Sequence, residues 1–343
     1  RMILYGGSSL CFYNLYCFYK HTSKIGNVIK QIPGVLILME TGSFDTRIIN
    51  NLQTMRNKIA TFIVSCFFLV TSQRCLAQTE AENVLNNEKA GGYHLVWADE
   101  FNKDGAPDTA SWRFERGFVR NEEFQWYQPE NAFCKNGVLI IEARREIKFN
   151  PVYKAGSSNW KAKRQNIEYT SSSINTGGKK FWKYGRFIMR GKIDISNGLW
   201  PAWWTLGVAG RWPSNGEIDI MEYYRDRILA NIACGTSVQN KAQWYSNTRS
   251  ADSLGGTAWS SQFHVWRMDW DEKAIALYMD DLLMNKVELS KLANKDGSGI
   301  NPFIQPHYML LNLAIGGQNG GDPSNTSFPN RYEIDYVRVY QKE

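Results

Sequence analysis

The feature that most constrains the fold is a long succession of short strand-like segments between Gly92 and the C-terminus. Apolar or alternating runs recur there, separated by turns rich in Gly and Asn, and helical periodicity is weak apart from a short helical turn expected at 289–293. Many strands at regular spacing are typical of a β-sandwich or barrel. The expected strands are Tyr93–Ala98, Gly137–Ala143, Tyr169–Thr176, Tyr184–Asp194, Leu199–Leu206, Glu217–Tyr223, Ile228–Cys234, Phe263–Asp271, Ala274–Met279, Tyr308–Leu313 and Tyr332–Tyr340.

One of these strands carries three carboxylates within six residues. Strict alternation places Glu217 and Asp219 on one face of the strand and Glu222 on the other, in the core. One extra residue near Ile220–Met221, a β-bulge, returns Glu222 to the face of the other two acids. The sequence therefore predicts a bulged strand with Glu217, Asp219 and Glu222 on the same side.

The first 91 residues do not continue the strand pattern. Met55 is followed by basic residues, an apolar run over 59–70 and small residues ending at Ala77, which is the pattern of a secretory signal peptide cleaved before Gln78. The apolar run is too short to cross a membrane comfortably, and a buried core helix is the alternative. We expect an upstream extension without assigned function at 1–54, a signal peptide at 55–77, a linker at 78–91 and a single catalytic domain at 92–343.

Charge and cysteine content exclude several classes of protein. The net charge is +7, yet eight basic and two acidic residues lie in the first 77, so residues 78–343 carry 32 basic and 31 acidic groups. This balance gives no reason to expect a nucleic-acid partner. Beyond residue 77 only Cys134 and Cys234 remain, and no zinc-like Cys/His spacing is present. A disulfide between them and separate burial are both open.

The acidic strand resembles the active-site motif of glycoside hydrolase family 16, in the form that contains the bulge residue. Similar segments flank it on both sides, and the resemblance covers about residues 92–343. It implies an all-β, concanavalin-like jelly roll, a sandwich of two curved antiparallel sheets with a substrate groove on the concave face. The segments that carry the resemblance are Leu95–Phe101, Gly198–Trp204, Trp212–Pro213, Glu217–Glu222, Phe263–Trp266, Leu311–Gly317 and Ile334–Tyr340.

The resemblance implies a catalytic role for each acid. Glu217 corresponds to the nucleophile and Glu222 to the general acid/base of a retaining double displacement, in which the two carboxyl groups lie about 5–5.5 Å apart. Asp219 orients the nucleophile, and like charge from Asp219 and Glu217 raises the pKa of Glu222. This chemistry requires no metal or organic cofactor.

Further residues are expected to bind sugar. Trp200 and Trp204 share parity on one strand and should face the groove with Trp212, whereas Trp203 should point into the core. The segment 121–127 resembles a family loop that commonly reads Asn-Asn-Glu-x-Gln-x-Tyr, with Glu122 in place of the second Asn, and a longer polar loop at 150–163 is expected at the groove rim. The expected substrate-binding residues are Trp200, Trp204, Trp212, Asn121, Gln125, Trp126 and Asn312.

The resemblance leaves the substrate open between two β-linked classes. One is a β-1,3- or mixed-linkage glucan, the first expectation. The other is a substrate of an endo-β-galactosidase: poly-N-acetyllactosamine, mucin-type glycans or a galactan. Two departures from the family pattern bear on this choice, Glu122 and the absence of a His, often present in β-1,3-glucanases, from the strand Ile228–Cys234. A non-catalytic carbohydrate-binding jelly roll is a third alternative, disfavoured because binding alone does not need three crowded carboxylates.

The remaining expectations concern surroundings and partners. Asp335 corresponds to a position that helps some members of the family hold a structural calcium ion. A signal peptide implies a secreted, periplasmic or cell-surface protein without a membrane span. Its partner is a β-linked polysaccharide or glycan substrate, and we expect a monomer.

Overall fold

The computed structural model describes residues 28–32, 35–39 and 91–342, and the chain divides into two units, residues 1–83 and 84–343. In the first unit, the described residues form an antiparallel hairpin of β1 (Val28–Ile32) and β2 (Val35–Met39). The expected signal peptide and nearly all of the linker lie outside the described residues. Among the residues that are described, no helix is both long and apolar enough to span a membrane.

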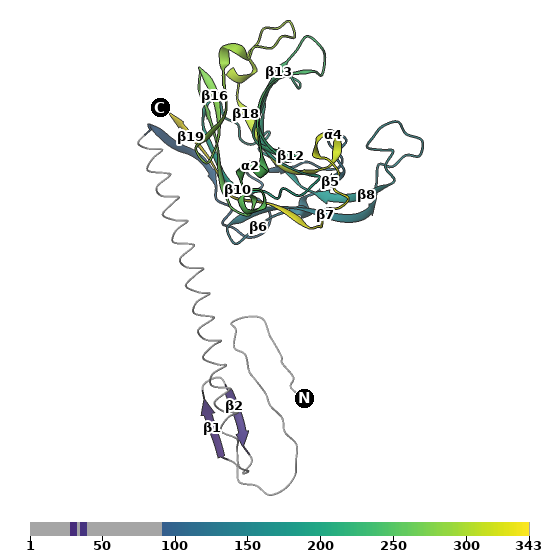
Figure 1. Cartoon of the computed structure of the whole chain (residues 1–343), viewed down its shortest axis with the longest axis vertical. Coiled ribbons are helices and arrows are strands. Elements are labelled where there is room, and N and C mark those ends of the chain that lie inside the picture. Colours follow the sequence, from purple (N-terminus) through teal and green to yellow (C-terminus); the bar gives the residue numbers. More distant parts are fainter. Residues whose placement is uncertain (1–27, 33–34, 40–90, 343) are drawn as a thin grey trace. The chain divides into compact units, whose positions relative to one another are not determined.

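The second unit is built from two β-sheets that pack face to face (Figure 1). The larger sheet has ten strands in the order β17-β16-β15-β10-β19-β7-β8-β5, with β3 paired to β19 and β6 paired to β7. All its pairs are antiparallel except β5 with β8. Its strands are β3 (Tyr93–Asp99), β5 (Gln125–Tyr127), β6 (Ala132–Lys135), β7 (Val138–Phe149), β8 (Asn166–Ser171), β10 (Gly185–Lys192), β15 (His264–Trp270), β16 (Ala274–Met279), β17 (Leu282–Glu288) and β19 (Asn330–Lys342).

The smaller sheet has seven strands, in the order β14-β13-β12-β11-β18-β9-β4, and all its pairs are antiparallel. It contains the acidic strand, β12, between β11 and β13. Its strands are β4 (Arg113–Phe114), β9 (Ser173–Asn175), β11 (Leu199–Gly207), β12 (Glu217–Tyr224), β13 (Arg227–Gly235), β14 (Ala242–Ser250) and β18 (His307–Ile315).

Helical structure is confined to single turns in the described part of the chain. Leu289–Lys291 forms a 3₁₀ turn inside the range where a helical turn was expected. The other short elements are α2 (Ala251–Leu254), α3 (Thr257–Ser260), α4 (Gly317–Gly320) and the 3₁₀ turns Pro129–Asn131 and Pro302–Ile304. The prediction of an all-β sandwich is confirmed.

The hydrophobic core lies between the two sheets, because alternate residues of each strand turn inward. The seven-stranded sheet contributes Trp203, Ile218 and Ile232, and the ten-stranded sheet contributes Trp266 and Val337, all essentially inaccessible to solvent. The prediction that Trp203 points into the core is therefore confirmed.

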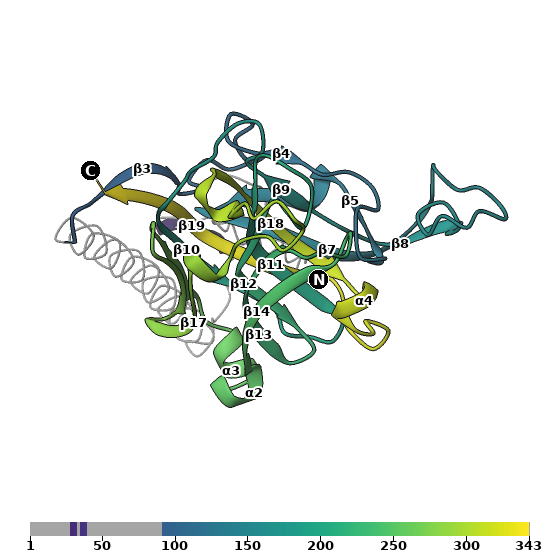
Figure 2. The ribbon, with the colours of Figure 1, turned by 90° about the horizontal axis from the view of Figure 1, so that it is seen from above.

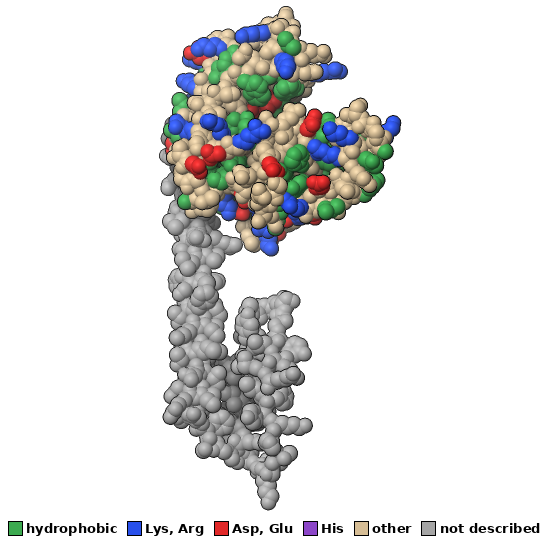
Figure 3. Space-filling view, turned by 45° about the vertical axis from the view of Figure 1, so that its right-hand side comes forward, with side chains coloured by type: hydrophobic (Ala, Val, Ile, Leu, Met, Phe, Trp, Pro, Cys, Tyr) green, Lys and Arg blue, Asp and Glu red, His purple; other side chains and the backbone are tan. Residues whose placement is uncertain are grey.

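The outer face of the seven-stranded sheet carries a separate apolar cluster. Ala202, Trp204 and Leu310 form it, with Leu206 and Tyr308 packed at its side. These residues alternate with the core residues of β11 and β18, so they project away from the sandwich interior. The molecular surface is hollowed on the side seen in Figure 3, where hydrophobic and acidic side chains lie next to one another.

Every expected strand is present, although the expected strand 169–176 is divided between β8 and β9, which belong to different sheets. The hairpin of β1 and β2 was not predicted, and neither were five strands of the second unit. β4, β5 and β6 are only two to four residues long, too short for a periodic signal. β14 is an edge strand of mostly polar residues, and β17 follows β16 after a two-residue turn. β7 continues beyond Ala143 into a polar hairpin with β8, whose connecting loop projects from the sheets (Figure 2).

Candidate functional site

The three acids lie on the outer face of β12, and a β-bulge places them there. Trp204 pairs with Asp219 and Trp203 pairs with Met221, which leaves Ile220 without a partner on β11. The pairing of β12 with β13 shifts between Asp219 and Glu222 as well. Ile220 and Met221 both turn into the core. The predicted bulge is confirmed, and it brings Glu222 to the side of Glu217 and Asp219.

The loop between β11 and β12 is held closely against the end of β11. A Cβ atom on Gly207 would lie 2.0 Å from the backbone oxygen of Asn215, so only glycine permits this approach. Asn215 also donates from Nδ2 to the oxygen of Gly207 at 3.0 Å. The loop carries Trp212, whose Nε1 donates to Oε2 of Glu217 at 2.5 Å. Trp212 itself is 41% exposed.

Glu222 is held from two sides. Trp200 Nε1 donates to its Oε1 at 2.7 Å, and Asn231 Nδ2 of β13 donates to its Oε2 at 3.0 Å. The Trp200 ring makes an edge contact with Tyr224 at 5.4 Å and is only 6% exposed. Trp200 therefore positions Glu222 and presents little free ring surface.

Asp219 lies between the two glutamates and is buried. Burial, with the charges of Glu217 and Glu222 added, raises its pKa well above the ordinary value for a carboxyl group. The raised pKa favours the protonated form of Asp219, which can donate to Glu217, with which it shares a hydrogen bond. This differs from the sequence-based view of Asp219 as an anion.

The surroundings separate the two glutamates by charge. Burial raises the pKa of both, that of Glu222 to about 8. For Glu217, hydrogen bonds from Trp212 and Asp219 and the charge of Arg120 lower the pKa and so oppose the effect of burial. For Glu222, hydrogen bonds from Trp200 and Asn231 oppose burial, while the charges of Glu217 and Glu123 add to it. The first cause of the raised pKa of Glu222 is thus burial, not the like charge expected from the sequence.

A second hydrogen-bonded chain lies beneath the apolar cluster. Trp204 Nε1 donates to Oδ1 of Asn312 at 2.7 Å, and Asn312 Nδ2 donates to the Tyr127 hydroxyl at 3.2 Å. That hydroxyl donates to Oε2 of Glu123, which also accepts from Gln125 Nε2 at 2.7 Å. Three residues expected to bind sugar, Trp204, Asn312 and Gln125, are held in place by these hydrogen bonds. Asn312, at 4% exposure, and Gln125, at 1%, present almost no surface to a substrate.

Asn121 and Trp126, two other expected substrate-binding residues, lie in the segment 121–127 and have different surroundings. Asn121 is exposed, and its Nδ2 donates to Oε1 of Glu123 at 3.3 Å. Trp126 is half-buried and packs edge-on against Phe118 at 5.4 Å. The loop after β7 reaches this region, since Arg164 donates to the backbone oxygens of Glu122 and Glu123. The structure thus joins the long polar loop to the segment 121–127.

Two residues of the site were not identified from the sequence. Asn231 contacts Glu222, and its signal was a lone polar residue in the apolar strand Ile228–Cys234. Arg120 lies over the ring of Trp204, with its guanidinium carbon 5.2 Å from the ring centroid. No periodic pattern marks Arg120, because it lies in the irregular connection between β4 and β5.

Asp335 lies apart from the acidic strand, on β19. Its Oδ2 accepts an ion pair from Arg190 at 2.8 Å. Within the described ranges, no group of three or more His, Cys, Asp or Glu side chains is arranged to hold a metal ion. The side chains around Asp335 do not by themselves make up a calcium site.

Both cysteines of the second unit, Cys134 and Cys234, are free and buried. Of the two arrangements left open by the sequence, the structure shows separate burial.

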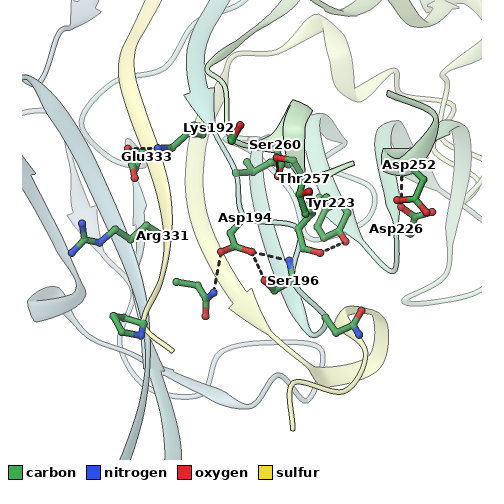
Figure 4. Close-up of a pocket in the computed structure, with 16 residues that line it drawn as sticks. Lys192, Asp194, Ser196, Tyr223, Asp226, Asp252, Thr257, Ser260, Arg331 and Glu333 are labelled. Carbon is green, nitrogen blue, oxygen red and sulfur yellow. Dashed lines mark hydrogen bonds and ion pairs between the residues drawn. The ribbon is translucent and has the colours of Figure 1, made fainter. Parts of the chain in front are cut away.

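A cavity of about 740 Å³ lies away from the three acids, and polar side chains line most of it (Figure 4). Lys192 and Glu333 form an ion pair of 3.0 Å on its wall, and Asp194 accepts from Ser196. Tyr223 also lines it, and strand alternation turns Tyr223 to the face opposite its neighbour Glu222. The cavity is therefore separate from the candidate site.

Comparison with known proteins adds to this geometry. A beta-glucanase of Rhodothermus marinus is 35% identical over 271 residues, which cover 74% of this chain and 87% of that protein. A keratan-sulfate endo-1,4-beta-galactosidase of Sphingobacterium multivorum is 28% identical, over 73% of this chain and 55% of that protein. The solved structure of an endo-acting O-glycanase from the human gut microbiota is 34% identical, with a TM-score of 0.66, over 74% of this chain and 92% of that one.

The family profile described as glycosyl hydrolases family 16 matches residues 121–338, more than half of the chain. That range includes β12 and the strands on either side of it. The chain belongs to glycosyl hydrolases family 16 and is an O-glycosyl hydrolase.

Proposed function

We propose that the second unit is a retaining, endo-acting glycoside hydrolase that cleaves internal β-linkages of a polysaccharide by double displacement. Glu217 attacks the anomeric carbon and forms a glycosyl-enzyme, while Glu222 protonates the leaving oxygen. Glu222 then takes a proton from the water that hydrolyses the intermediate. Asp219 donates a hydrogen bond to Glu217 and keeps it aligned.

The observation that supports these roles is the unequal environment of the two glutamates. Glu217 accepts hydrogen bonds from Trp212 and Asp219 and lies in the field of a cation. Glu222 lies in the field of two carboxylates, with its pKa raised to about 8. A nucleophile must be ionised and an acid catalyst protonated, so the distribution of charge matches the proposed roles.

Product stereochemistry tests the mechanism directly. Two displacements at one carbon restore the starting configuration, so proton NMR of fresh hydrolysate should show the β-anomer first and the α-anomer only after mutarotation. Release of the α-anomer first would mean a single displacement, and Glu217 would then not be a nucleophile.

The first substrate candidate is a β-1,3- or mixed-linkage glucan. The beta-glucanase of Rhodothermus marinus, at 35% identity, supports it. The protein should then shorten laminarin or mixed-linkage glucan rapidly to oligosaccharides of several residues, as an endo-acting enzyme does.

The second candidate is an internal β-galactosidic linkage in poly-N-acetyllactosamine or mucin-type glycans. Two features support it: Glu122 departs from the common sequence of the family loop, and Asn231 lies beside Glu222 on a strand without histidine. The keratan-sulfate galactosidase and the O-glycanase are relatives with such substrates in their names. A panel of laminarin, mixed-linkage glucan, agarose, keratan sulfate and mucin O-glycans separates the two candidates by which material yields oligosaccharides.

We also propose that the protein is exported and acts outside the cytoplasm as a monomer. The signal-peptide pattern at 55–77 supports export, and a polysaccharide substrate is consistent with it. The mature N-terminus should be Gln78, which mass spectrometry of the N-terminal peptide of secreted protein would show, including the pyroglutamate that an N-terminal Gln readily forms. A secreted chain that still contained residues 1–54 would contradict the assignment.

A further inference from the structure

Arg120 is the cation whose charge acts on Glu217. Arg120 is fixed in three ways: its Nη2 pairs with Oε2 of Glu115, its guanidinium covers the Trp204 ring, and its side chain is only 23% exposed. Oε2 of Glu115 also accepts from Ser173 Oγ at 2.6 Å, which holds the carboxylate in place. The position of the guanidinium is therefore determined by several partners at once.

The guanidinium lies above the row of residues that contains the acids. Trp204 pairs with Asp219, and Leu206, two residues further along the same face of β11, pairs with Glu217. Tyr308 pairs with Leu206 and lies close to both Arg120 and Glu217, so the guanidinium over Trp204 lies toward the nucleophile end of the acidic strand. Nη1 of Arg120 is buried without a hydrogen-bond partner in the described structure. The ion pair with Glu115 therefore leaves part of the guanidinium charge without a direct partner.

We propose that Arg120 is a positioning residue for the reaction, which holds Glu217 in its ionised, attacking form without touching the substrate. The proposal rests on the assignment of Glu217 as nucleophile. Without the positive charge of Arg120, the three acids would share a largely buried patch. The state of lowest free energy would then have more of these carboxyl groups protonated.

Other titratable groups that face Arg120 come from four elements around it. They are Glu115 after β4, Glu123 and Tyr127 at β5, Tyr308 on β18 and Glu217 on β12. Burial opposes the charge on Arg120, but the carboxylates of Glu115 and Glu123 raise its pKa above the usual value, so it stays protonated throughout the working range. In turn, the charge of Arg120 lowers the pKa of Glu217.

Arg120 is among the main influences on the pKa of Glu217 and not among those on the pKa of Glu222. The charges that act on Glu222 come from Glu217 and Glu123 instead. Removal of the charge at residue 120 should thus raise the pKa of Glu217 and leave that of Glu222 nearly unchanged. In a profile of kcat/KM against pH, the acidic limb reports the nucleophile and the basic limb the acid.

The test compares pH profiles of wild type, Arg120→Gln, Arg120→Lys and Arg116→Gln, on laminarin or, if wild type does not cut it, on gastric mucin. For Arg120→Gln we expect the acidic limb to move up by about one pH unit, the basic limb to stay, and KM to change little. Arg120→Lys should keep the wild-type acidic limb. Arg116 is exposed, and Arg116→Gln changes the net charge by the same amount as Arg120→Gln. Arg116→Gln should therefore leave the pH profile unchanged.

Several results would overturn the proposal. They are an unmoved acidic limb in Arg120→Gln, equal movement of both limbs, or a shift of the same size in Arg116→Gln. If Arg120→Gln does not fold in a thermal melt, Arg120→Met, whose side chain packs on Trp204, replaces it with the same expectation. A change of acidic limb in Arg120→Lys as large as in the neutral variant would also contradict it. Inactive wild type on both substrates would instead count against the proposed function.

Discussion

Trp200 donates a hydrogen bond from Nε1 to Oε1 of Glu222 at 2.7 Å, across the pair of strands β11 and β12. An indole that bonds to a carboxyl group favours its ionised form, so this contact lowers the pKa of Glu222 against the stronger effect of burial. The bond thus acts on the proposed acid catalyst, and it links Trp200, a residue expected to stack on sugar, to the proposed chemistry.

Replacement of Trp200 by Phe should therefore move the basic limb of the pH profile. The lost donor leaves Glu222 protonated to higher pH than its wild-type pKa of about 8, so activity should persist further into the alkaline range. The acidic limb should not move, since Glu217 has other donors. Trp244→Phe, on edge strand β14, is a suitable control. A basic limb that stayed in place would show that the bond has no influence on Glu222.

The two glutamates should differ when each is changed to Gln. Glu217→Gln removes the nucleophile, and turnover should fall by several orders of magnitude on every substrate. Glu222→Gln removes the proton donor, so aryl glycosides with good leaving groups should retain far more activity than polysaccharide. Rates on both substrate types measure the contrast. Equal losses for Glu222→Gln on both types would argue against acid catalysis by that residue.

Asp219 should tolerate Asn better than Leu. Burial raises the pKa of Asp219 and favours its protonated form, so Asn should mimic both the neutral charge and the donor toward Glu217, and we expect a modest loss of kcat/KM. Leu has no donor; loss of the bond costs about 1–3 kcal/mol and should move the acidic limb to higher pH. Circular dichroism and a thermal melt would check that both variants fold. If Asn and Leu reduced kcat/KM alike, the donor role would be wrong.

Trp212 and Leu95 offer a comparison of two similarly exposed apolar side chains, at 41% and 45% exposure. Trp212 bonds to Glu217, whereas Leu95 lies on β3 of the ten-stranded sheet, opposite Tyr340. Trp212→Ala should weaken oligosaccharide binding by about 1–2 kcal/mol, the contribution of one aromatic platform, and Leu95→Ala should not. Isothermal titration in a Glu217→Gln background gives the affinities. A melting temperature that fell sharply for Trp212→Ala would instead mark the residue as structural.

The free cysteines predict resistance to thiol chemistry in the native state. Burial raises the pKa of Cys134 to about 12 and also raises that of Cys234, so thiolate is scarce at neutral pH. Native protein should react with Ellman's reagent only on unfolding, and a reductant should leave the melting temperature unchanged. A lower melting temperature in reductant would reveal a disulfide.

The β12 bulge, the shared face of the three acids and the inward direction of Trp203 could all be predicted from sequence. They follow from the alternation of side chains along a strand and from the free-energy cost of burying a carboxylate. Both can be judged from neighbouring residues in the sequence. The pairing of Asn312 with Tyr127 and the cover of Trp204 by Arg120 could not. They join segments between 84 and 185 residues apart, and only the assembled sheets bring such segments together.

The bulge in β12 has a consequence for changes in chain length. Loss of Met221 would give Glu-Ile-Asp-Ile-Glu, in which plain alternation already turns both glutamates outward. Loss of Ile218 would instead reverse Asp219 relative to Glu217. At the bulge, the strand can therefore lose one residue and still present the three acids on one face. The loss removes one side chain from the core. A one-residue deletion, which would invert the side chains beyond it in an ordinary strand, can be absorbed at that position.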